Sequence, residues 1–317
     1  MIRFQESALH GALAGIVGVD SVCARAPLAH FTTFGIGGPA DWLVEPRGDQ
    51  QIVALLRLAQ GLGLPVTILG GGSNVLVSDR GVRGLVIRPR GGTAREESPG
   101  EIRADAALTM NGLVRWTIAR GCQGLEAWAG TPGTVGGAIY GNAHFAGRTI
   151  DELVVSVRLS SRGGEVSDVP RDELGFAYDR SRLHETREVL LSASFRVRPG
   201  ADPASLRAVA RESLAYRKRT QPLGAPSAGC IFRNPPAASL PPGVPTSAGA
   251  LVDLAGMKGC RLGGARVSPL HANFIVNEGG ATAASVRELV EKCREAVLAR
   301  FGVRLQEEIV YIGDWGQ

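Results

Sequence analysis

Lysine and aromatic residues are scarce in this 317-residue sequence, and long hydrophobic runs are missing. Only Lys218, Lys258 and Lys292 are lysines, and aromatic residues make up 5% of the chain. The arginines are scattered among acids, with one dense basic cluster at 217–219. A nucleic-acid-binding surface needs a basic stripe and aromatic rings for stacking, so we expect no nucleic-acid partner. A membrane-spanning helix needs a run of about 18 apolar residues, so we expect none.

Cysteine is equally sparse and is not arranged for metal binding. The five cysteines lie far apart and form no CxxC pair, at Cys23, Cys122, Cys230, Cys260 and Cys293. Zinc sites and thioredoxin-type redox centres depend on such closely spaced pairs, so we predict neither, and no bound metal. The N-terminus also lacks the charged start of a secretory signal. Both observations favour a cytoplasmic protein with reduced thiols.

Glycine, in contrast, is abundant, with 43 residues in the chain. Such an excess predicts many tight turns and places where backbone approaches another group closely. The chain length predicts about two domains. The composition changes around Pro199–Pro203, and we place the main boundary there, which gives domains 1–202 and 203–317. Helices and strands alternate irregularly along the chain, which favours an α+β fold over a regularly wound parallel sheet.

Apolar periodicity predicts four helices and several strands. The helices begin at Asp49, run from Asn111 to Ala119, follow Pro203 toward Tyr216, and lie between a capping Thr282 and Gly302. The predicted strands are Val66–Leu69, Val75–Val77, Leu85–Ile87, Val154–Leu159, Val189–Val197 and Ile309–Ile312. We expect an exposed hairpin or connector at Gly91–Gly100 and irregular structure in the proline-rich segment 234–247.

Two glycine-rich segments are the candidate ligand-binding motifs. The first comprises Gly70, Gly71, Gly72, Ser73 and Asn74, directly after a predicted strand. Its successive N–H groups and its polar side chains suit an anion, although a plain turn between strands explains it equally well when it is considered alone. It contains neither the lysine of a P-loop nor the GxGxxG pattern of a Rossmann fold.

The second segment runs from 129 to 142 and carries no charge. It includes Gly130, Thr131, Pro132, Gly133, Thr134, Gly136, Gly137 and Ala138. Glycines with apolar spacers indicate backbone lying against a large flat ligand, with Val135, Ala138 and Ile139 facing an aromatic ring. Two such segments favour a dinucleotide, bound on a fold other than the two familiar nucleotide-binding ones.

Longer stretches make the interpretation specific, because the chain resembles the UDP-N-acetylenolpyruvoylglucosamine reductases, in particular their type II members. The matching stretches follow the family's order: TTFGIGGPADWLVEP (32–46), LGGGSNVLVSD (69–79), GLEAWAGTPGTVGGAIYGNA (124–143), SAGCIFRNP (227–235) and AGALVDLAGMKGCRLGGARVSPLHANFIVN (248–277). The resemblance implies a two-lobed FAD-binding domain of the vanillyl-alcohol-oxidase type, with lobes at about 25–90 and 91–202. A smaller C-terminal substrate domain, 203–317, would follow it.

The resemblance also implies the reaction and its cofactors. NADPH gives a hydride to non-covalently bound FAD, and the hydride then passes to the vinyl carbon of UDP-N-acetylglucosamine enolpyruvate, a precursor in peptidoglycan synthesis. A general acid protonates the adjacent carbon, which gives UDP-N-acetylmuramate. The family's acid is a serine, and the corresponding position here is Cys230. A thiol is largely protonated near neutral pH, so it can donate the proton.

Two charged residues complete the catalytic set that the resemblance implies. The family glutamate aligns with Glu308, and Glu307 is expected to be a solvated neighbour. The family arginine belongs to a Tyr-Arg-x-Ser motif that reads Tyr-Asp-Arg-Ser here, with Asp179 at the arginine position and Arg180 one residue later. Either the backbone bulges so that Arg180 reaches the substrate, or another arginine acts; we favour Arg180.

The remaining predicted site residues concern substrate binding. The dense basic cluster suggests a diphosphate site, although a basic helix end that complements the helix dipole is the competing explanation. The predicted substrate-binding residues are Arg217, Gln221, Arg233, Asn234 and Asn273. We expect His271 to be structural. The substrate is a small molecule, and we expect a monomer.

Two other functions fit a flavin-binding chain: a flavoprotein without this turnover, favoured by the altered Tyr-Asp-Arg-Ser motif, and an oxidase on the same scaffold. Flavin binding alone requires neither the SAGCIFRNP stretch nor Glu308, so the sequence favours the reductase.

Overall fold

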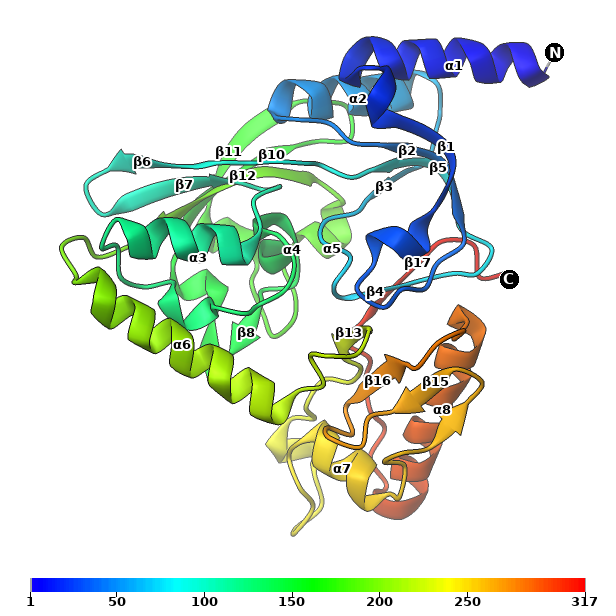
Figure 1. Cartoon of the computed structure of the whole chain (residues 1–317), viewed down its shortest axis with the longest axis vertical. Helices are drawn as coiled ribbons and strands as arrows, with labels where there is room; N and C mark the ends of the chain where they lie inside the picture. Colours follow the sequence, from blue (N-terminus) through cyan, green and yellow to red (C-terminus); the bar gives the residue numbers. More distant parts are fainter. Residues whose placement is uncertain (1, 317) are drawn as a thin grey trace. The chain divides into compact units, whose positions relative to one another are not determined.

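The computed structural model describes residues 2–316, which form two compact units (Figure 1). The first unit comprises Met1–Ala26, Ala40–Gly71 and Arg83–Ala215. The second comprises Pro27–Pro39, Gly72–Val82 and Tyr216–Gln317. The units therefore exchange segments along the chain, whereas the predicted domains 1–202 and 203–317 are continuous.

A four-stranded sheet and two helices form one part of the first unit. The strands follow the order β1 (Val22–Pro27), β2 (Pro39–Val44), β5 (Val82–Ile87) and β3 (Val66–Ile68). Helices α1 (Ile2–Val17) and α2 (Asp49–Gly61) pack side by side beside this sheet (Figure 1). The helix predicted from Asp49 is confirmed, but Gly48 occupies the capping position and Asp49 lies in the first turn. A carboxylate there complements the helix dipole without capping a backbone N–H.

A five-stranded antiparallel sheet forms the other part of the first unit. Its order is β11 (Val166–Pro170), β10 (Val154–Ser160), β12 (Val189–Arg196), β7 (Glu101–Asp105) and β6 (Ala94–Ser98). Helices α3 (Met110–Ala119) and α4 (Val135–Tyr140) lie along this sheet (Figure 1). The core between them contains the fully buried side chains of Trp128 and Phe195. The predicted hairpin at 91–100 is the exposed β6 and the turn into β7.

Helix α6 (Pro203–Thr220) explains why the first unit extends past the predicted boundary. Its residues Leu206 and Ala210 are buried in the same core as Trp128. The apolar stripe of this helix therefore attaches residues 203–215 to the first unit. The helix predicted after Pro203 is confirmed.

The second unit is built on a four-stranded antiparallel sheet with the order β13 (Ser227–Cys230), β16 (Phe274–Asn277), β15 (Ala265–Val267) and β14 (Arg261–Leu262). Helices α7 (Ala248–Leu254) and α8 (Ala283–Phe301) pack on it. The predicted caps of α8 are confirmed, since the Thr282 side chain accepts the Ser285 N–H and Gly302 ends the helix with a left-handed φ of 68°. The carboxylate of Asp79 accepts two further N–H groups at its start, from Ala283 and Ala284.

A parallel pair of strands, β4 (Val75–Val77) and β17 (Val310–Ile312), joins distant parts of the second unit. The predicted strands are all present, with ends shifted by at most three residues, and the segment 234–247 contains only one short 3-10 turn. Helices mixed with largely antiparallel sheets confirm the α+β prediction. The remaining elements are β8 (His144–Phe145), β9 (Arg148–Thr149), α5 (Leu183–Thr186) and the 3-10 turns Val19–Ser21, Leu28–Phe31, Glu126–Trp128, Ile150–Glu152, Arg171–Leu174 and Ala237–Ser239.

The helices of the described residues include none that is both long and apolar enough to cross a membrane.

Candidate functional site

Within the first unit, Gly70 and Gly71 of the first glycine-rich segment lie directly against the second segment. A Cβ atom added to Gly71 would stand 2.6 Å from the Cα of Gly133, and one added to Gly70 would stand 2.8 Å from Thr134 Oγ1. Neither contact leaves room for a side chain. The segments that the sequence predicts to share a ligand are therefore neighbours, and glycine is required where their backbones meet.

Several N–H groups of the second segment are already used within the protein. Gly136 donates to the Ala106 carbonyl at 2.9 Å, and Gly137 donates to Thr134 Oγ1 at 3.3 Å. Gly130 donates to Asn111 Oδ1 at 2.7 Å. These bonds fix the shape of the segment. Part of its glycine content consequently serves packing against the protein itself.

The expectation that Val135, Ala138 and Ile139 face a ligand ring is wrong. Residues 135–140 form the short helix α4, and all three side chains are buried in the hydrophobic core. An apolar residue that follows a helix cap at this spacing turns toward the sheet beneath it. The part of the segment left near the surface is its backbone and the residues before the helix.

The surface-facing backbone fits FAD chemically. The partly accessible residues are small and uncharged, namely Gly70, Gly71, Ser73, Asn74, Gly130, Thr131, Pro132, Gly133, Gly136 and Gly137. A dinucleotide's pyrophosphate would meet no like charge among them. Gly72 has a left-handed φ of 64°, and a Cβ there would stand 2.2 Å from the Phe31 carbonyl oxygen. The turn at Gly72 is therefore a shape that only glycine permits.

In the second unit, Cys230 ends strand β13 opposite Phe274 of β16. Its thiol is half-buried. Gly229, directly before it, has a left-handed φ of 84° and interrupts the regular strand pairing. The irregularity at this point changes the direction of the chain between Ser227 and Cys230.

Glu308 lies on the segment that pairs with the chain just after Cys230. The Glu308 N–H donates to the Ile231 carbonyl at 2.8 Å, and Asn74 Nδ2 donates to the Glu308 carbonyl at 3.3 Å. The second unit thus places the predicted acid and the predicted glutamate on adjacent backbone segments. Asn74, from the first glycine-rich segment, is hydrogen-bonded to the backbone of Glu308.

The description of Glu307 as a solvated neighbour is wrong. Its carboxylate forms an ion pair with Arg294 of α8 and accepts a hydrogen bond from the Tyr311 hydroxyl at 3.3 Å. Successive side chains of an extended segment point to opposite sides. Glu307 therefore attaches the segment to α8, which leaves Glu308 on the other side.

Arg217 is the buried member of the basic cluster. It is 5% exposed, whereas Lys218 and Arg219 are exposed. Burial lowers the pKa of Arg217 to about 10, and the electrostatic interaction with Cys230 acts in the opposite direction. A basic residue that only complements a helix dipole does not need to be buried. The burial of the Arg217 guanidinium therefore favours a role in a binding site.

Asn273 has a different task from the one predicted. It is 3% exposed, and its side-chain amide accepts the Phe232 N–H at 2.9 Å and donates to the Phe232 carbonyl at 2.8 Å. We therefore assign Asn273 to holding the backbone next to Cys230 rather than to the substrate. Its own N–H donates to His271 Nδ1 at 3.2 Å, which agrees with the structural role predicted for His271.

The other predicted substrate residues lie on the same part of the second unit. The Arg233 N–H donates to the Gln306 carbonyl at 2.9 Å, and the exposed Asn234 accepts the Ala248 N–H at 2.9 Å through its side chain. The Gln221 N–H donates to the Arg217 carbonyl at 2.8 Å. Their contacts with a substrate stay a prediction.

Arg180 and Asp179 occupy a tight turn of the first unit. Ala177 and Arg180 exchange two backbone hydrogen bonds, and Asp179 at the corner has a left-handed φ of 53°. Because of this turn Asp179 is buried at 7% exposure, while the Arg180 side chain is 51% exposed and pairs with Glu185. The side chain directed inward is the aspartate. Arg180 as the catalytic arginine stays a prediction.

Two family profiles match different parts of the chain. Residues 40–169 match the profile of an FAD binding domain. Residues 221–312 match the profile of the UDP-N-acetylenolpyruvoylglucosamine reductase C-terminal domain. The FAD-binding domain and the C-terminal domain that the sequence predicts are therefore both present, and FAD is the cofactor.

Individual relatives agree over nearly the whole length. The chain is 40% identical to UDP-N-acetylenolpyruvoylglucosamine reductase of Synechococcus sp. over 96% of this chain and 97% of that protein. It is 42% identical to reductase 2 of Symbiobacterium thermophilum over 89% of each. The crystal structure of the Thermus caldophilus reductase superposes with a TM-score of 0.75 at 32% identity, over 90% of this chain and 97% of that one. The chain belongs to the UDP-N-acetylenolpyruvoylglucosamine reductase family.

Proposed function

We propose that this chain reduces UDP-N-acetylenolpyruvoylglucosamine with Cys230 as the proton donor. The chain is an FAD-dependent oxidoreductase that uses NADPH and acts in peptidoglycan synthesis, as its family membership shows. The observation that supports the assignment of the acid is the pairing in the second unit, where Glu308 N–H donates to the carbonyl of the residue after Cys230.

When bound, FAD would supply the hydride chemistry between NADPH and the substrate. The glycine-rich segments would hold it, through Gly70–Asn74 and Gly130–Ala138. The segments meet without side chains between them, so their shape is fixed before the cofactor binds. A preformed site avoids the entropy cost of ordering a loop on binding.

Cys230 gives a proton to the substrate carbon next to the one that receives the hydride. Arg217, buried and close enough to interact electrostatically with Cys230, stabilises the thiolate that remains after proton transfer. Proton transfer from a stronger acid has a lower free-energy barrier. The Asn273 amide holds Phe232, so the backbone that carries the thiol is rigid. We propose that Glu308, on the backbone segment next to Cys230, acts on the same reacting group of the substrate.

The substrate's diphosphate is assigned to positive groups of the second unit. Arg217 and Arg233 are the candidate cations, with Gln221 and Asn234 as neutral partners. Charged hydrogen bonds to phosphate are about twice as strong as neutral ones.

We further propose that the protein works as a monomer in the cytoplasm. The wide separation of the five cysteines in the sequence favours reduced thiols, as in cytoplasmic proteins. Sedimentation velocity of the flavin-loaded protein tests the oligomeric state, and a dimer at micromolar concentration would contradict it.

The decisive experiment follows NADPH oxidation by purified yellow protein. Oxidation that depends on UDP-N-acetylenolpyruvoylglucosamine and yields UDP-N-acetylmuramate supports the reductase. Flavin that is reduced but not reoxidised by this substrate indicates a flavoprotein without this turnover. Rapid reoxidation by oxygen with release of peroxide indicates an oxidase. Either of the last two results contradicts the proposal.

A further inference from the structure

The start of helix α3 holds the second glycine-rich segment by hydrogen bonds. The Met110 N–H donates to the Gly133 carbonyl at 3.1 Å, and the Val135 N–H donates to the Leu108 carbonyl at 2.8 Å. Both bonds join backbone to backbone. Helix α3 is itself fixed, because its residue Leu113 is fully buried in the core of the first unit. The segment therefore lies against a rigid helix end.

One side chain of α3 adds a contact of a different kind. Asn111 Oδ1 accepts the Gly130 N–H at 2.7 Å, and Asn111 Nδ2 donates to the Thr131 carbonyl at 3.4 Å. A single half-buried amide thus holds two successive residues of the segment. Its two partners fix which end of the amide is the oxygen, because an N–H requires an acceptor and a carbonyl requires a donor.

The backbone of the segment is permissive at this point. Gly130 has a φ of 82° and Gly133 a φ of 96°, both in the left-handed region. Glycine adopts such values without steric cost, but it adopts many others as readily. A segment with two such residues would sample several conformations if its backbone were not held. Asn111 acts at Gly130 and Thr131, whereas the backbone bonds from α3 act farther along the segment.

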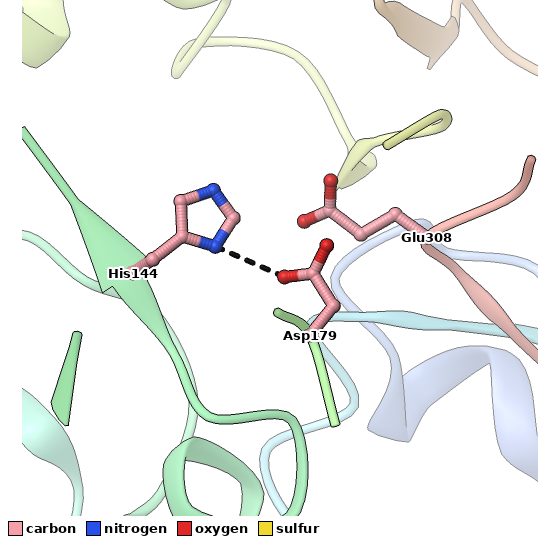
Figure 2. Close-up of side chains that lie close together, drawn as sticks. All are labelled: His144, Asp179 and Glu308. Atoms are coloured by element: carbon pink, nitrogen blue, oxygen red, sulfur yellow. Dashed lines mark ion pairs between the residues drawn. The ribbon is translucent and has the colours of Figure 1, made fainter. Parts of the chain in front are cut away.

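The polar contact that follows α4 acts on another part of the chain. Nδ1 of His144 is 2.9 Å from Oδ1 of Asp179 (Figure 2). These side chains come from loops 140–146 and 177–181, and the first of these loops follows α4. The contact therefore fixes the chain beyond the segment rather than at Gly130.

A neutral amide suits a place beside a bound anion. FAD carries a diphosphate, and the proposed function assigns the segment 130–138 to this cofactor. An ionised aspartate has the same shape as asparagine and could accept the Gly130 N–H, but it could not donate to the Thr131 carbonyl. Its negative charge would also repel the diphosphate. Asparagine provides both contacts without a charge.

We propose that Asn111 is a positioning residue for FAD, which holds Gly130 and Thr131 in the conformation that receives the diphosphate of the cofactor. The proposal rests on the proposed function, because that function assigns the segment to FAD. Without Asn111, part of the free energy of FAD binding would be used to order the segment. The apparent affinity then falls with the fraction of molecules whose segment is already in the binding conformation.

The first test measures FAD binding to the Asn111→Ala holoenzyme from the flavin fluorescence that appears after dilution. We expect the Kd to rise about 5- to 30-fold, the effect of losing one or two ordinary hydrogen bonds. The rate of the fluorescence rise gives the dissociation rate constant, and this constant divided by the Kd gives the association rate constant. Because bound FAD holds the segment in both proteins, dissociation should change less than about threefold, and slower association should account for the rest.

Gln50→Ala is the matched control for this substitution. Gln50 is the second residue of α2, as Asn111 is of α3, and it carries an exposed amide in the same unit. Its substitution removes an amide without touching the segment. The Kd of this variant for FAD should therefore stay within about twofold of the wild-type value.

A second variant, Asn111→Asp, tests whether the side chain lies close to the diphosphate. At about 0.05 M salt its Kd for FAD should be at least as high as that of Asn111→Ala, because the carboxylate repels the diphosphate. The ratio of its Kd to the wild-type Kd should fall at about 0.5 M salt, because salt screens this repulsion. A purely structural role predicts no such salt dependence. If Asn111→Ala does not fold, this variant carries the test, since it keeps the acceptor for Gly130.

The possible results are distinct. An unchanged Kd in Asn111→Ala, or a change confined to the dissociation rate, overturns the positioning role. A Kd ratio of Asn111→Asp that does not depend on salt also overturns it. Gly71→Ala separates this proposal from the proposed function: if it weakens FAD binding and Asn111→Ala does not, only the role of Asn111 fails. If neither variant weakens FAD binding, the assignment of the glycine-rich segments to FAD is itself wrong.

Discussion

At the scale of single residues, the second unit differs from its family pattern at the position that we propose donates the proton. Cys230 replaces a hydroxyl with a thiol, whose deprotonated form is a nucleophile. Arg217 is the positive charge that interacts electrostatically with Cys230. Because a thiolate is nucleophilic, we expect Cys230 to be sensitive to alkylation.

Alkylation of Cys230 is expected to stop turnover without affecting flavin reduction. Iodoacetamide should abolish reoxidation by the substrate while NADPH still bleaches the flavin, and bound substrate should protect. Cys230→Ser should retain substantial activity and resist the reagent, and Cys230→Ala should stop after flavin reduction. Stopped-flow absorbance at the flavin band measures both halves.

The other cysteines provide the control for this experiment. Burial raises the pKa of Cys293 to about 12, so it should not react, whereas the exposed Cys23 should be alkylated with no effect on the rate. Peptide mapping identifies the modified thiols. If Cys230→Ala turns over at a rate near that of the wild type, the thiol is not the proton donor.

At the same scale, we predict that substitution of Asn273 lowers the stability of the protein. Asn273→Ala would leave the buried N–H and carbonyl of Phe232 without the partners they now have. An unsatisfied buried backbone group costs about 1–3 kcal/mol. We expect urea unfolding of the flavin-loaded protein to show a loss of at least that size. Gln306→Ala, at an exposed side chain, should stay within about 0.5 kcal/mol.

At the scale of elements, we expect the close approach of the two glycine-rich segments to decide the affinity for FAD. A methyl group at Gly71 would overlap backbone atoms of Gly133, and backbone cannot move aside as a flexible side chain can. Gly71→Ala should therefore push the segments apart and weaken FAD binding by at least about 10-fold. Flavin fluorescence during dilution measures the Kd.

Gly15→Ala is the matched control for this substitution. Gly15 is an exposed residue within α1, and a Cβ there would meet nothing within 4 Å. Alanine favours a helix by about 1 kcal/mol over glycine, so this variant should bind FAD normally and be slightly more stable. Equal FAD affinity in the two variants would show that the segments tolerate separation.

At the scale of the whole molecule, we expect FAD to be bound without a covalent link. Neither glycine-rich segment, 70–74 or 130–138, contains a histidine or cysteine, and the nearby His144 is engaged with Asp179. Acid precipitation should release all flavin into the supernatant. Yellow colour that remains with the precipitated protein would show a covalent bond.

The sequence by itself determined the family, the cofactor and most of the secondary structure. Residue-level patterns are sufficient for these, because helix caps such as Thr282 and long exact motifs act locally. Local geometry also predicts that the side chains of Glu307 and Glu308 point to opposite sides. It does not predict that Glu307 forms an ion pair with Arg294. A partner 13 residues away across a turn is set by packing rather than by spacing.

Only the tertiary structure decided which polar groups face inward. The turn at Asp179 reverses the side expected for Arg180, because one left-handed residue redirects the chain, and no local propensity requires an aspartate to adopt it. The sequence likewise predicts that Asn273 binds substrate, whereas its amide binds the backbone of Phe232, 41 residues away. Burial and partner choice depend on which distant segments meet, and here His144 and Asp179 meet because Ser181 and Asn142 join their loops.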